Sequence, residues 1–310
     1  MTTSSQRAYV WVWLPNQTSP IKYQTHEHQD ASLAELQEAS EYIEAGEPLP
    51  PALEQAIQHG SSIGGARPKA LLNDKERKLV AKFSSSTDLY SVVKAEFMAM
   101  RLARLVGLDV APVEMTHSLG KDVLLVERFD RIQTTGSWSR RIVLSALTLL
   151  GLDEMMARYA SYEALGHLIR AEFDQPGPTL RELFGRIVFN VLCGNTDDHA
   201  RNHAAFWDGK TYRLTPAYDI CPQSRTGGEA TQAMLLHGQE RRSQLVHCLE
   251  AAAQLGLTQV QAHEIIGHQL TTIREQWDRV CEQAELSRVD RSYLWGRQFL
   301  NPFALEGYTS

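Results

Sequence analysis

Short apolar runs separated by turns dominate the first half of the chain and predict strands. Aromatic and β-branched residues mark the runs at 9–14 and 21–23, while 70–72 and 79–83 form a hairpin across a polar reversal, and 113–116 and 123–126 follow. Two longer patterns with apolar spacings of three and four predict helices at 31–45 and 90–106, each followed by a glycine.

From Leu144 onward, long amphipathic stretches predict a mainly helical second half. Thr179 and Glu182 have the spacing of a capping box that opens a helix at 180–193, and Gly194 can end that helix in the left-handed conformation. One interruption is expected, a hairpin at 204–214 that turns at Asp208 and Gly209. We expect an α+β protein with two lobes, a small mixed one at 1–130 and a larger helical one at 131–310.

Composition narrows the class of protein. The 310 residues are 43% hydrophobic and 22% charged with a net charge of −6, which disfavours direct binding to nucleic acid. The four cysteines lie far apart without a CxxC pair, which argues against a zinc ribbon and a secreted disulfide framework. The N-terminus lacks the pattern of a secretion signal, and no apolar run reaches the ~18 residues of a membrane helix. We expect a cytoplasmic protein with no membrane partner.

The stretch NTDDHARNH at 195–203 follows the apolar helix and concentrates polar side chains. Asp197 and Asn202 have the D-x-x-x-x-N spacing of a kinase catalytic loop, and Asp219 returns a second carboxylate after the hairpin. Alone, this pattern favours a solvated turn with capping Asp and Asn. A zinc site on His199 and His203 is disfavoured because the H-E-x-x-H glutamate is missing, so both histidines are expected to support the loop.

Other features occur in the order found in kinases. Gly64 and Gly65 lie in a small-residue loop that can approach phosphates, although a plain turn is equally common. Lys82 interrupts an apolar strand and Glu96 lies on an apolar helix stripe, where a carboxylate needs a cation. We expect the two to pair. The turn after 123–126 offers backbone groups of Glu127 and Phe129 to an adenine edge.

The stretches SIGGARPKALL, VERFDR, GNTDDHARNH and LTPAYDI together resemble the HipA family of bacterial serine/threonine kinases, the toxins of type II toxin–antitoxin modules. The resemblance covers about residue 62 to the C-terminus and implies a two-lobed, protein-kinase-like fold that uses ATP and Mg²⁺. It makes Asp197 the catalytic base, Asn202 and Asp219 the magnesium ligands, and Glu96 and His199 supporting residues. The ATP-binding residues it implies are Ile63, Gly64, Gly65, Ala66, Arg67, Lys69, Lys82, Glu127 and Phe129.

The resemblance also implies regulation and partners. Ser62 matches the family's autophosphorylated serine, whose modification inactivates the kinase, and Ser61 is a second candidate acceptor. The implied substrate is an aminoacyl-tRNA synthetase, glutamyl or tryptophanyl, and phosphorylating it halts translation. A helix-turn-helix antitoxin is expected to bind operator DNA, so that contact with DNA is indirect.

The chain departs from the family pattern at its N-terminus, where only 61 residues precede Ser62. This favours a short, HipT-like form in which a small separate protein supplies the missing N-terminal subdomain and acts as antitoxin. Two other functions stay open, a nucleotide-gated binding protein or co-repressor with little catalysis, and a small-molecule kinase. Intact Asp197, Asn202, Asp219 and Lys82 argue against the first, and the VERFDR and PAYDI stretches disfavour the second.

Overall fold

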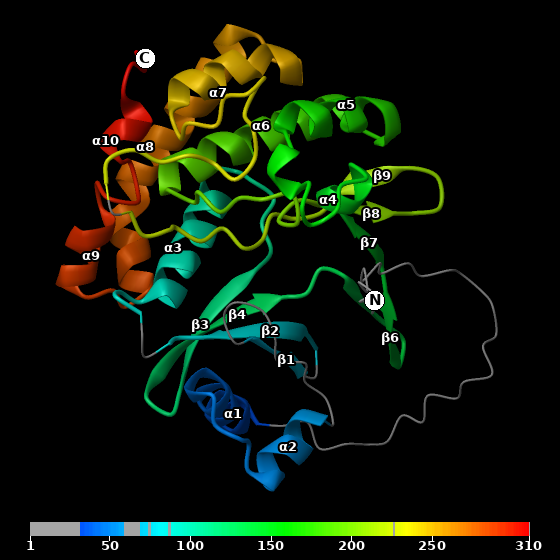
Figure 1. Ribbon diagram of the computed structural model, residues 1–310, viewed down its shortest axis with the longest axis vertical. Helices are drawn as coiled ribbons and strands as arrows, with labels where there is room; N and C mark the ends of the chain where they lie inside the picture. Colours follow the sequence, from blue (N-terminus) through cyan, green and yellow to red (C-terminus); the bar gives the residue numbers. More distant parts are fainter. Residues whose placement is uncertain (1–31, 59–68, 74–75, 86–87, 226, 310) are drawn as a thin grey trace, which may run out of the picture.

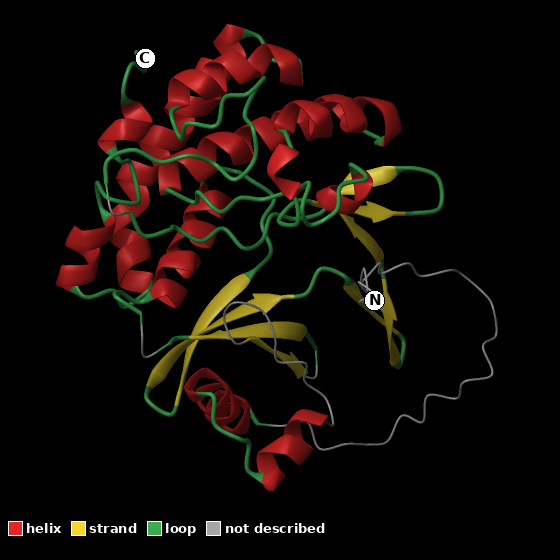
Figure 2. Ribbon diagram, in the orientation of Figure 1, coloured by secondary structure: helices red, strands yellow, loops and turns green. Residues whose placement is uncertain are grey.

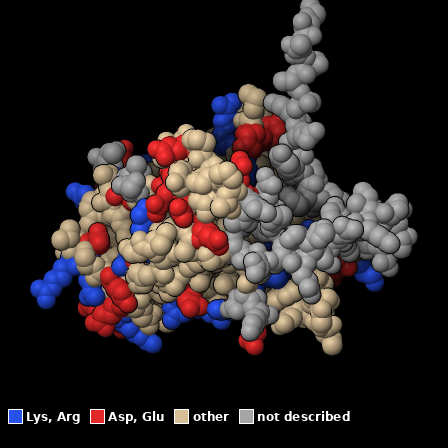
Figure 3. Space-filling model, turned by 90° about the horizontal axis from the view of Figure 1, so that it is seen from below, with Lys and Arg blue, Asp and Glu red and all other residues tan. Residues whose placement is uncertain are grey.

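The computed structural model describes residues 32–58, 69–73, 76–85, 88–225 and 227–309, and it has the expected α+β fold with two lobes (Figures 1 and 2). The strands predicted at 9–14 and 21–23 lie outside the described residues. None of the described helices is long and apolar enough to cross a membrane. On the face seen in Figure 3, acidic and basic side chains intermingle, and neither sign forms a continuous surface.

A four-stranded antiparallel sheet forms the small lobe, with strand order β1-β2-β4-β3. The strands are β1 (Lys69–Asn73), β2 (Lys78–Phe83), β3 (Val113–Ser118) and β4 (Lys121–Glu127). Each contains a predicted apolar run and extends it by one or two residues. The sequence therefore predicted these four strands correctly.

The two faces of the sheet carry different helices. Helix α1 (Leu33–Ala45) begins with a capping box between Ser32 and Glu35 and packs with α2 (Pro51–Gln58) at one side of the sheet (Figure 1). The α1 side of β2 is apolar and buried, with Leu79, Ala81 and Phe83 in one cluster with Leu36. Because successive strand residues point to opposite faces, Lys82 points away from this cluster.

Helix α3 (Val92–Leu105) connects the lobes. It contacts β3 and β4 of the sheet and also α8 (Gln259–Gln283) of the large lobe. Its buried stripe includes Glu96 together with Val93, Met100 and Ala103. The helix therefore holds one carboxylate at the junction of the two lobes.

Three strands that follow the small sheet were not predicted from the sequence. A hairpin of β5 (Arg131–Thr134) and β6 (Ser137–Arg140) follows the small sheet, and β7 (Ile142–Ser145) then pairs with β8 (Ala204–Trp207). The expected hairpin of β8 and β9 (Tyr212–Leu214) is present, so β7, β8 and β9 form a second sheet. Short, half-exposed strands of this kind carry little apolar periodicity.

The large lobe is mainly helical and is built around α6 (Pro176–Cys193), most of which is buried. Around it lie α4 (Ala146–Leu149), α5 (Tyr162–Glu172), α7 (Leu245–Ala252), α8, α9 (Arg288–Leu294) and α10 (Pro302–Leu305), with 3-10 turns η1 (Ala157–Tyr159) and η2 (Ala253–Leu255). The expectation of a single interruption at 204–214 is wrong, because the described residues 215–225 and 227–244 form a second long segment without a helix, called segment 215–244 below. This segment passes from the lobe junction to α7.

The predicted capping box of α6 is also wrong. The helix begins at Pro176, whose fixed φ suits the first helical turn, so Thr179 lies inside the helix. The Thr179 hydroxyl donates to the Gln175 carbonyl at 2.6 Å, and Glu182 accepts from Arg186 Nε at 2.8 Å. At the other end, Gly194 ends the helix with φ 71°, as predicted.

Candidate active site

Lys82, Glu96 and Asp219 form a charge cluster where the lobes meet, in which Lys82 and Glu96 are largely buried and the Asp219 side chain is 37% exposed. The Lys82 ammonium donates to Glu96 Oε1 at 2.5 Å and to Asp219 Oδ1, and the Lys82 side chain is only 11% exposed. The lysine comes from β2, the glutamate from α3 and the aspartate from the segment after β9. The expected pairing of Lys82 with Glu96 is present, and Asp219 joins it from 137 residues further along the chain.

Burial and charge act against each other in this cluster. Burial by itself lowers the pKa of Lys82, but attraction to Glu96 and Asp219 outweighs it and raises the pKa above its ordinary value. Burial raises the pKa of Glu96, and Lys82 offsets only part of this rise. For Asp219 the attraction of Lys82 outweighs burial, and the pKa of the carboxyl falls. Lys82 and Asp219 are therefore both charged at neutral pH.

The backbone of Asp219 has φ 59°, in the left-handed region that non-glycine residues rarely adopt. Hydrogen bonds on both sides hold this conformation. Ala217 N–H donates to Asp109 O at 2.7 Å, and Gln223 N–H donates to Gly194 O at 3.0 Å. The carboxylate is thus aimed by a strained residue between two anchored ones, an arrangement typical of functional sites.

The loop after α6 holds two adjacent carboxylates in opposite environments. Asp197 is exposed, and within the described chain its carboxylate accepts no hydrogen bond. Asp198 is buried and accepts from the Tyr162 hydroxyl, from Asn190 Nδ2 at 2.7 Å and from His203 Nε2 at 3.0 Å. Burial raises the pKa of Asp198, but His203 and these donors outweigh it and the pKa is lowered. Asp198 fixes the loop, while Asp197 faces outward.

Asn202 is oriented by the same loop. It is buried, and its Nδ2 lies 3.4 Å from the Asp197 carbonyl. This contact uses the amide nitrogen, so the amide oxygen of Asn202 is left to accept from a ligand or bind a cation. His199 lies nearby with a buried Nδ1 that has no hydrogen-bond partner among the described residues. The Nδ1 atom of His203 is likewise without a partner there, but its Nε2 lies 3.0 Å from Asp198, so His203 supports the loop as expected.

Gly194 allows the loop to leave α6 close to the C-terminal segment. A Cβ atom at this position would lie 2.7 Å from the carbonyl oxygen of Gln298. On the other side of the turn, Asn195 Nδ2 donates to Asn190 Oδ1 at 3.0 Å. Asn190 therefore braces both Asn195 and Asp198 from within the helix.

The segment at Glu127 and Phe129 presents one acceptor and one donor. Glu127 N–H donates to Pro112 O at 2.9 Å, so this N–H is not open to a ligand. The opposite residue is proline and has no N–H to return the bond, which leaves the Glu127 carbonyl without its antiparallel partner. Phe129 N–H has no bond to the rest of the described chain, and its ring packs on Tyr218 and Phe206.

Of the residues expected in the glycine-rich loop, only Lys69 lies in the described part of the chain. Lys69 begins β1 and lies opposite Lys82 in the β1–β2 register. The remaining residues of the glycine-rich loop and both candidate phosphorylation sites lie outside the described residues: Ser61, Ser62, Ile63, Gly64, Gly65, Ala66 and Arg67.

The supporting network around Asp198 was missed by sequence reasoning. Tyr162 comes from α5 and Asn190 from the middle of α6, and neither is near the loop in a simple motif. One signal was present, since Asn190 is a polar residue inside the apolar run 187–193. A buried amide in such a run needs a partner, and Asp198 and Asn195 provide it.

The two-lobed fold is that of protein kinases. The chain belongs to the HipA family, because the model of the HipA-like C-terminal domain matches residues 61–277.

Two proteins named as kinases are similar in sequence to part of this chain. A putative kinase, Y4mE, of Sinorhizobium fredii is 30% identical over 51% of this chain and 41% of its own length. The serine/threonine-protein kinase toxin HipA of Shewanella oneidensis is 28% identical over 51% of this chain and 42% of its own length. The chain thus matches only about two fifths of the length of these relatives.

A solved structure shows the same fold. It is the Shewanella oneidensis complex of HipA, HipB and operator DNA, which aligns with a TM-score of 0.67 and 22% identity over 84% of this chain and 67% of the matched chain.

Proposed function

We propose that the chain is an ATP- and Mg²⁺-dependent serine/threonine protein kinase and the toxin of a type II toxin–antitoxin module. The observation that carries the proposal is the Lys82, Glu96 and Asp219 cluster, together with an exposed Asp197 on the loop after α6. A lysine paired to a helix glutamate, next to a metal-binding aspartate and a free carboxylate, is the arrangement that phosphoryl transfer needs.

The donor set fits Mg²⁺, which prefers oxygen ligands. The Asp219 carboxylate and the Asn202 amide oxygen would hold the ion, which shields the phosphate charge when bound. Lys82 contacts Asp219 in the structure. We propose that this contact yields when nucleotide binds, so that Lys82 stays on Glu96 and turns its remaining protons toward the phosphates.

Asp197 would orient the substrate hydroxyl and accept its proton. Its exposure allows a protein side chain to reach it, while the buried Asp198 network prevents the loop from moving away. The Glu127 carbonyl and Phe129 N–H would pair with the adenine edge. We also propose that the small lobe ends near Asp130, before the β5–β6 hairpin.

The target and partners follow from the family. The proposed substrate is an aminoacyl-tRNA synthetase, glutamyl or tryptophanyl, and autophosphorylation at Ser62 would switch the kinase off. The Shewanella relative was solved with HipB and operator DNA, which supports a helix-turn-helix antitoxin that carries the DNA contact. A small separate protein equivalent to the N-terminal subdomain is the second proposed antitoxin.

The test is incubation of the dephosphorylated chain with labelled ATP, Mg²⁺ and a cytosolic extract, followed by mass spectrometry of labelled bands. Asp197→Asn should abolish labelling while ATP binding persists. Asp278→Asn, an exposed aspartate on α8, is the matched control and should label like the wild type. If the wild type binds ATP but labels nothing, itself included, a nucleotide-gated binding protein would be favoured instead.

A further inference from the structure

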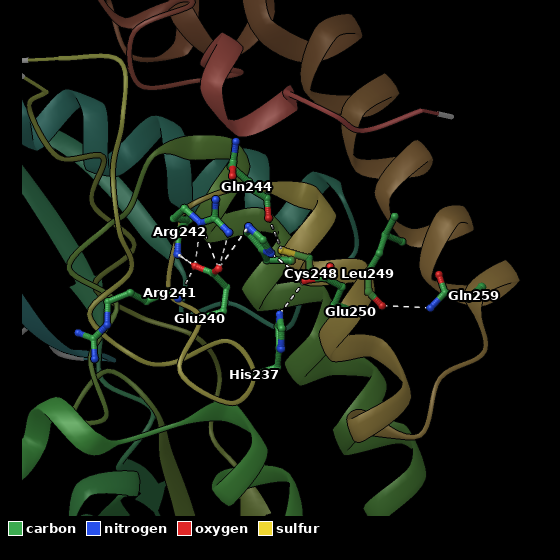
Figure 4. Close-up of polar contacts among 10 residues, drawn as sticks. His237, Glu240, Arg241, Arg242, Gln244, Cys248, Leu249, Glu250 and Gln259 are labelled. Carbon is green, nitrogen blue, oxygen red and sulfur yellow. Dashed lines mark hydrogen bonds and ion pairs between the residues drawn. The ribbon is translucent and has the colours of Figure 1, made fainter.

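Two histidines and a glutamate converge outside the candidate active site (Figure 4). His237 lies in the segment 215–244, while His247 and Glu250 are one turn apart on α7. His237 Nε2 lies 2.8 Å from Glu250 Oε2, and His247 Nδ1 lies 2.7 Å from the same oxygen. Three potential metal ligands from two elements therefore point at one place.

The spacing of these atoms suits a small ion. The three ligand atoms lie within 4.8 Å of one another. Ligands around a tetrahedral zinc ion are separated by ~3.3 Å, given metal–ligand bonds of about 2.0–2.2 Å. Relative to Glu250 Oε2, each histidine nitrogen would move outward by about 0.5 Å to admit the ion. Both Glu250, 55% exposed, and His237, 25% exposed, leave a path from solvent.

A second feature that favours a metal ion lies on the far side of the His247 ring. His247 is buried, and its Nε2 has no hydrogen-bond partner among the described residues. This nitrogen faces Glu240 Oε2 at 3.6 Å. Metal-binding histidines usually direct the other ring N–H at a carboxylate, which fixes the tautomer. Glu240 is placed for that role when Nδ1 binds the metal.

Glu240 is held as an anion in this position. Arg242 donates to both of its carboxylate oxygens, at 2.6 Å from Nη2 and 3.0 Å from Nε, and these bonds lower the pKa of Glu240 to about 2. The backbone N–H groups of Arg241 and Arg242 also donate to Glu240 Oε1, at 2.9 and 2.8 Å.

We propose that His237 Nε2, His247 Nδ1 and Glu250 Oε2 bind a divalent transition-metal ion of the zinc type. Two imidazole nitrogens and one carboxylate select Zn²⁺, Co²⁺ or Ni²⁺ over Mg²⁺ and Ca²⁺, which prefer oxygen alone. Three protein ligands leave one position for water. The site is separate from the Asp219 and Asn202 pair and does not depend on the proposed kinase activity.

Such an ion would clamp the segment 215–244 onto α7. This segment also contacts the candidate catalytic loop, since Ala233 N–H donates to Thr196 O at 3.0 Å. Next to it, Leu235 O accepts from Tyr162 N–H at 3.0 Å, and the Tyr162 hydroxyl donates to Asp198. The metal would therefore stabilise the backbone that supports both Thr196 and Asp198.

Calorimetric titration of the metal-free full chain with Zn²⁺, without nucleotide, tests the site. The expected result is one high-affinity ion per chain and a higher melting temperature. His237→Ala and Glu250→Gln should weaken the site by about 100-fold or more, since even outer contacts of metal sites are worth about 10–100-fold. His268→Ala and Glu264→Gln, from an exposed i, i+4 pair on α8, should bind Zn²⁺ like the wild type.

Two further measurements make the result unambiguous. Circular dichroism of the metal-free variants should match the wild type, because His237 and Glu250 are partly exposed. Co²⁺ should give visible d–d bands without the thiolate charge-transfer band of a cysteine ligand. A wild type that binds no Zn²⁺, or variants that bind it equally well, would overturn the site even if the chain phosphorylates its target.

Discussion

Lys82 Nζ lies 2.5 Å from Glu96 Oε1, which joins β2 of the small lobe to the helix that packs against the large lobe. Replacing Glu96 with Gln removes one of the two carboxyl groups that accept from the Lys82 ammonium. We expect unfolding free energy to fall by about 1–3 kcal/mol, since Asp219 still compensates in part. ATP affinity should fall as well, because Lys82 then pairs only with Asp219 and competes with Mg²⁺.

Urea unfolding and nucleotide titration measure both effects. The control is Glu114→Gln, whose ion pair with Arg77 is largely exposed, and we expect a change within about 0.5 kcal/mol. Equal losses in the two variants would contradict a special role for the buried pair.

Asp198→Asn should lower stability at neutral pH by about 2–4 kcal/mol, because a buried carboxylate with three donors is replaced by an amide. The pKa of Asp198 is lowered by folding, so its ionised form stabilises the protein above the unfolded pKa of about 3.9. That contribution is lost as pH falls through the folded pKa. The stability difference between wild type and variant should therefore shrink below about pH 4.

Acid unfolding followed between pH 7 and pH 3 gives this difference directly. A difference that stays constant over the whole range would show that Asp198 is not ionised in the folded chain.

Gly194→Ala should be more destabilising than Gly46→Ala, although both glycines end helices at nearly the same φ, 71° and 68°. A Cβ at Gly46 meets nothing within 4 Å, so only the left-handed backbone is penalised, by about 1 kcal/mol. At Gly194 the new atom meets Gln298 backbone at 2.7 Å, and the loop must shift. Thermal unfolding of both variants isolates the steric part, and similar melting temperatures would argue against it.

Pro112→Ala should weaken ATP binding without a matching loss of stability. Alanine restores an N–H opposite the Glu127 carbonyl, which can then close the β3–β4 ladder instead of pairing with adenine. Losing one hydrogen bond of about 0.5–1.5 kcal/mol predicts an affinity about 2- to 12-fold lower. Pro302→Ala on α10 is the control, and titration with an ATP analogue compares the two. Unchanged affinity in Pro112→Ala would remove Glu127 from the proposed adenine contact.

Local chemistry explains which parts of the fold the sequence could predict. Helix α3, the small sheet and the β8–β9 hairpin have strong periodicity or a clear turn, and each was found within one or two residues where described. The start of α6 was missed because Pro176 outweighed the Thr179 and Glu182 pattern. Strands β5 to β7 and the unpatterned segment 215–244 depend on tertiary contacts, which apolar spacing does not show.

The candidate site also contains one feature that the sequence could predict and one that it could not. Pairing of Lys82 with Glu96 could be predicted because a carboxylate on a buried stripe needs a cation. The distinction between Asp197 and Asp198 could not, since adjacent identical residues give no local signal. It depends on Tyr162, Asn190 and His203, which reach Asp198 only in the folded chain.

The opposite environments of Asp197 and Asp198 also limit how the chain can change in length. Gly194 fixes one end of the loop and the contact of Asn202 with the Asp197 carbonyl fixes the other. Inserting one residue before Asp197 would place this carboxylate in the buried position of Asp198, and removing one residue there would place Asp198 in the exposed position of Asp197. Substitutions can be absorbed elsewhere in this lobe, but this loop should tolerate no insertion or deletion.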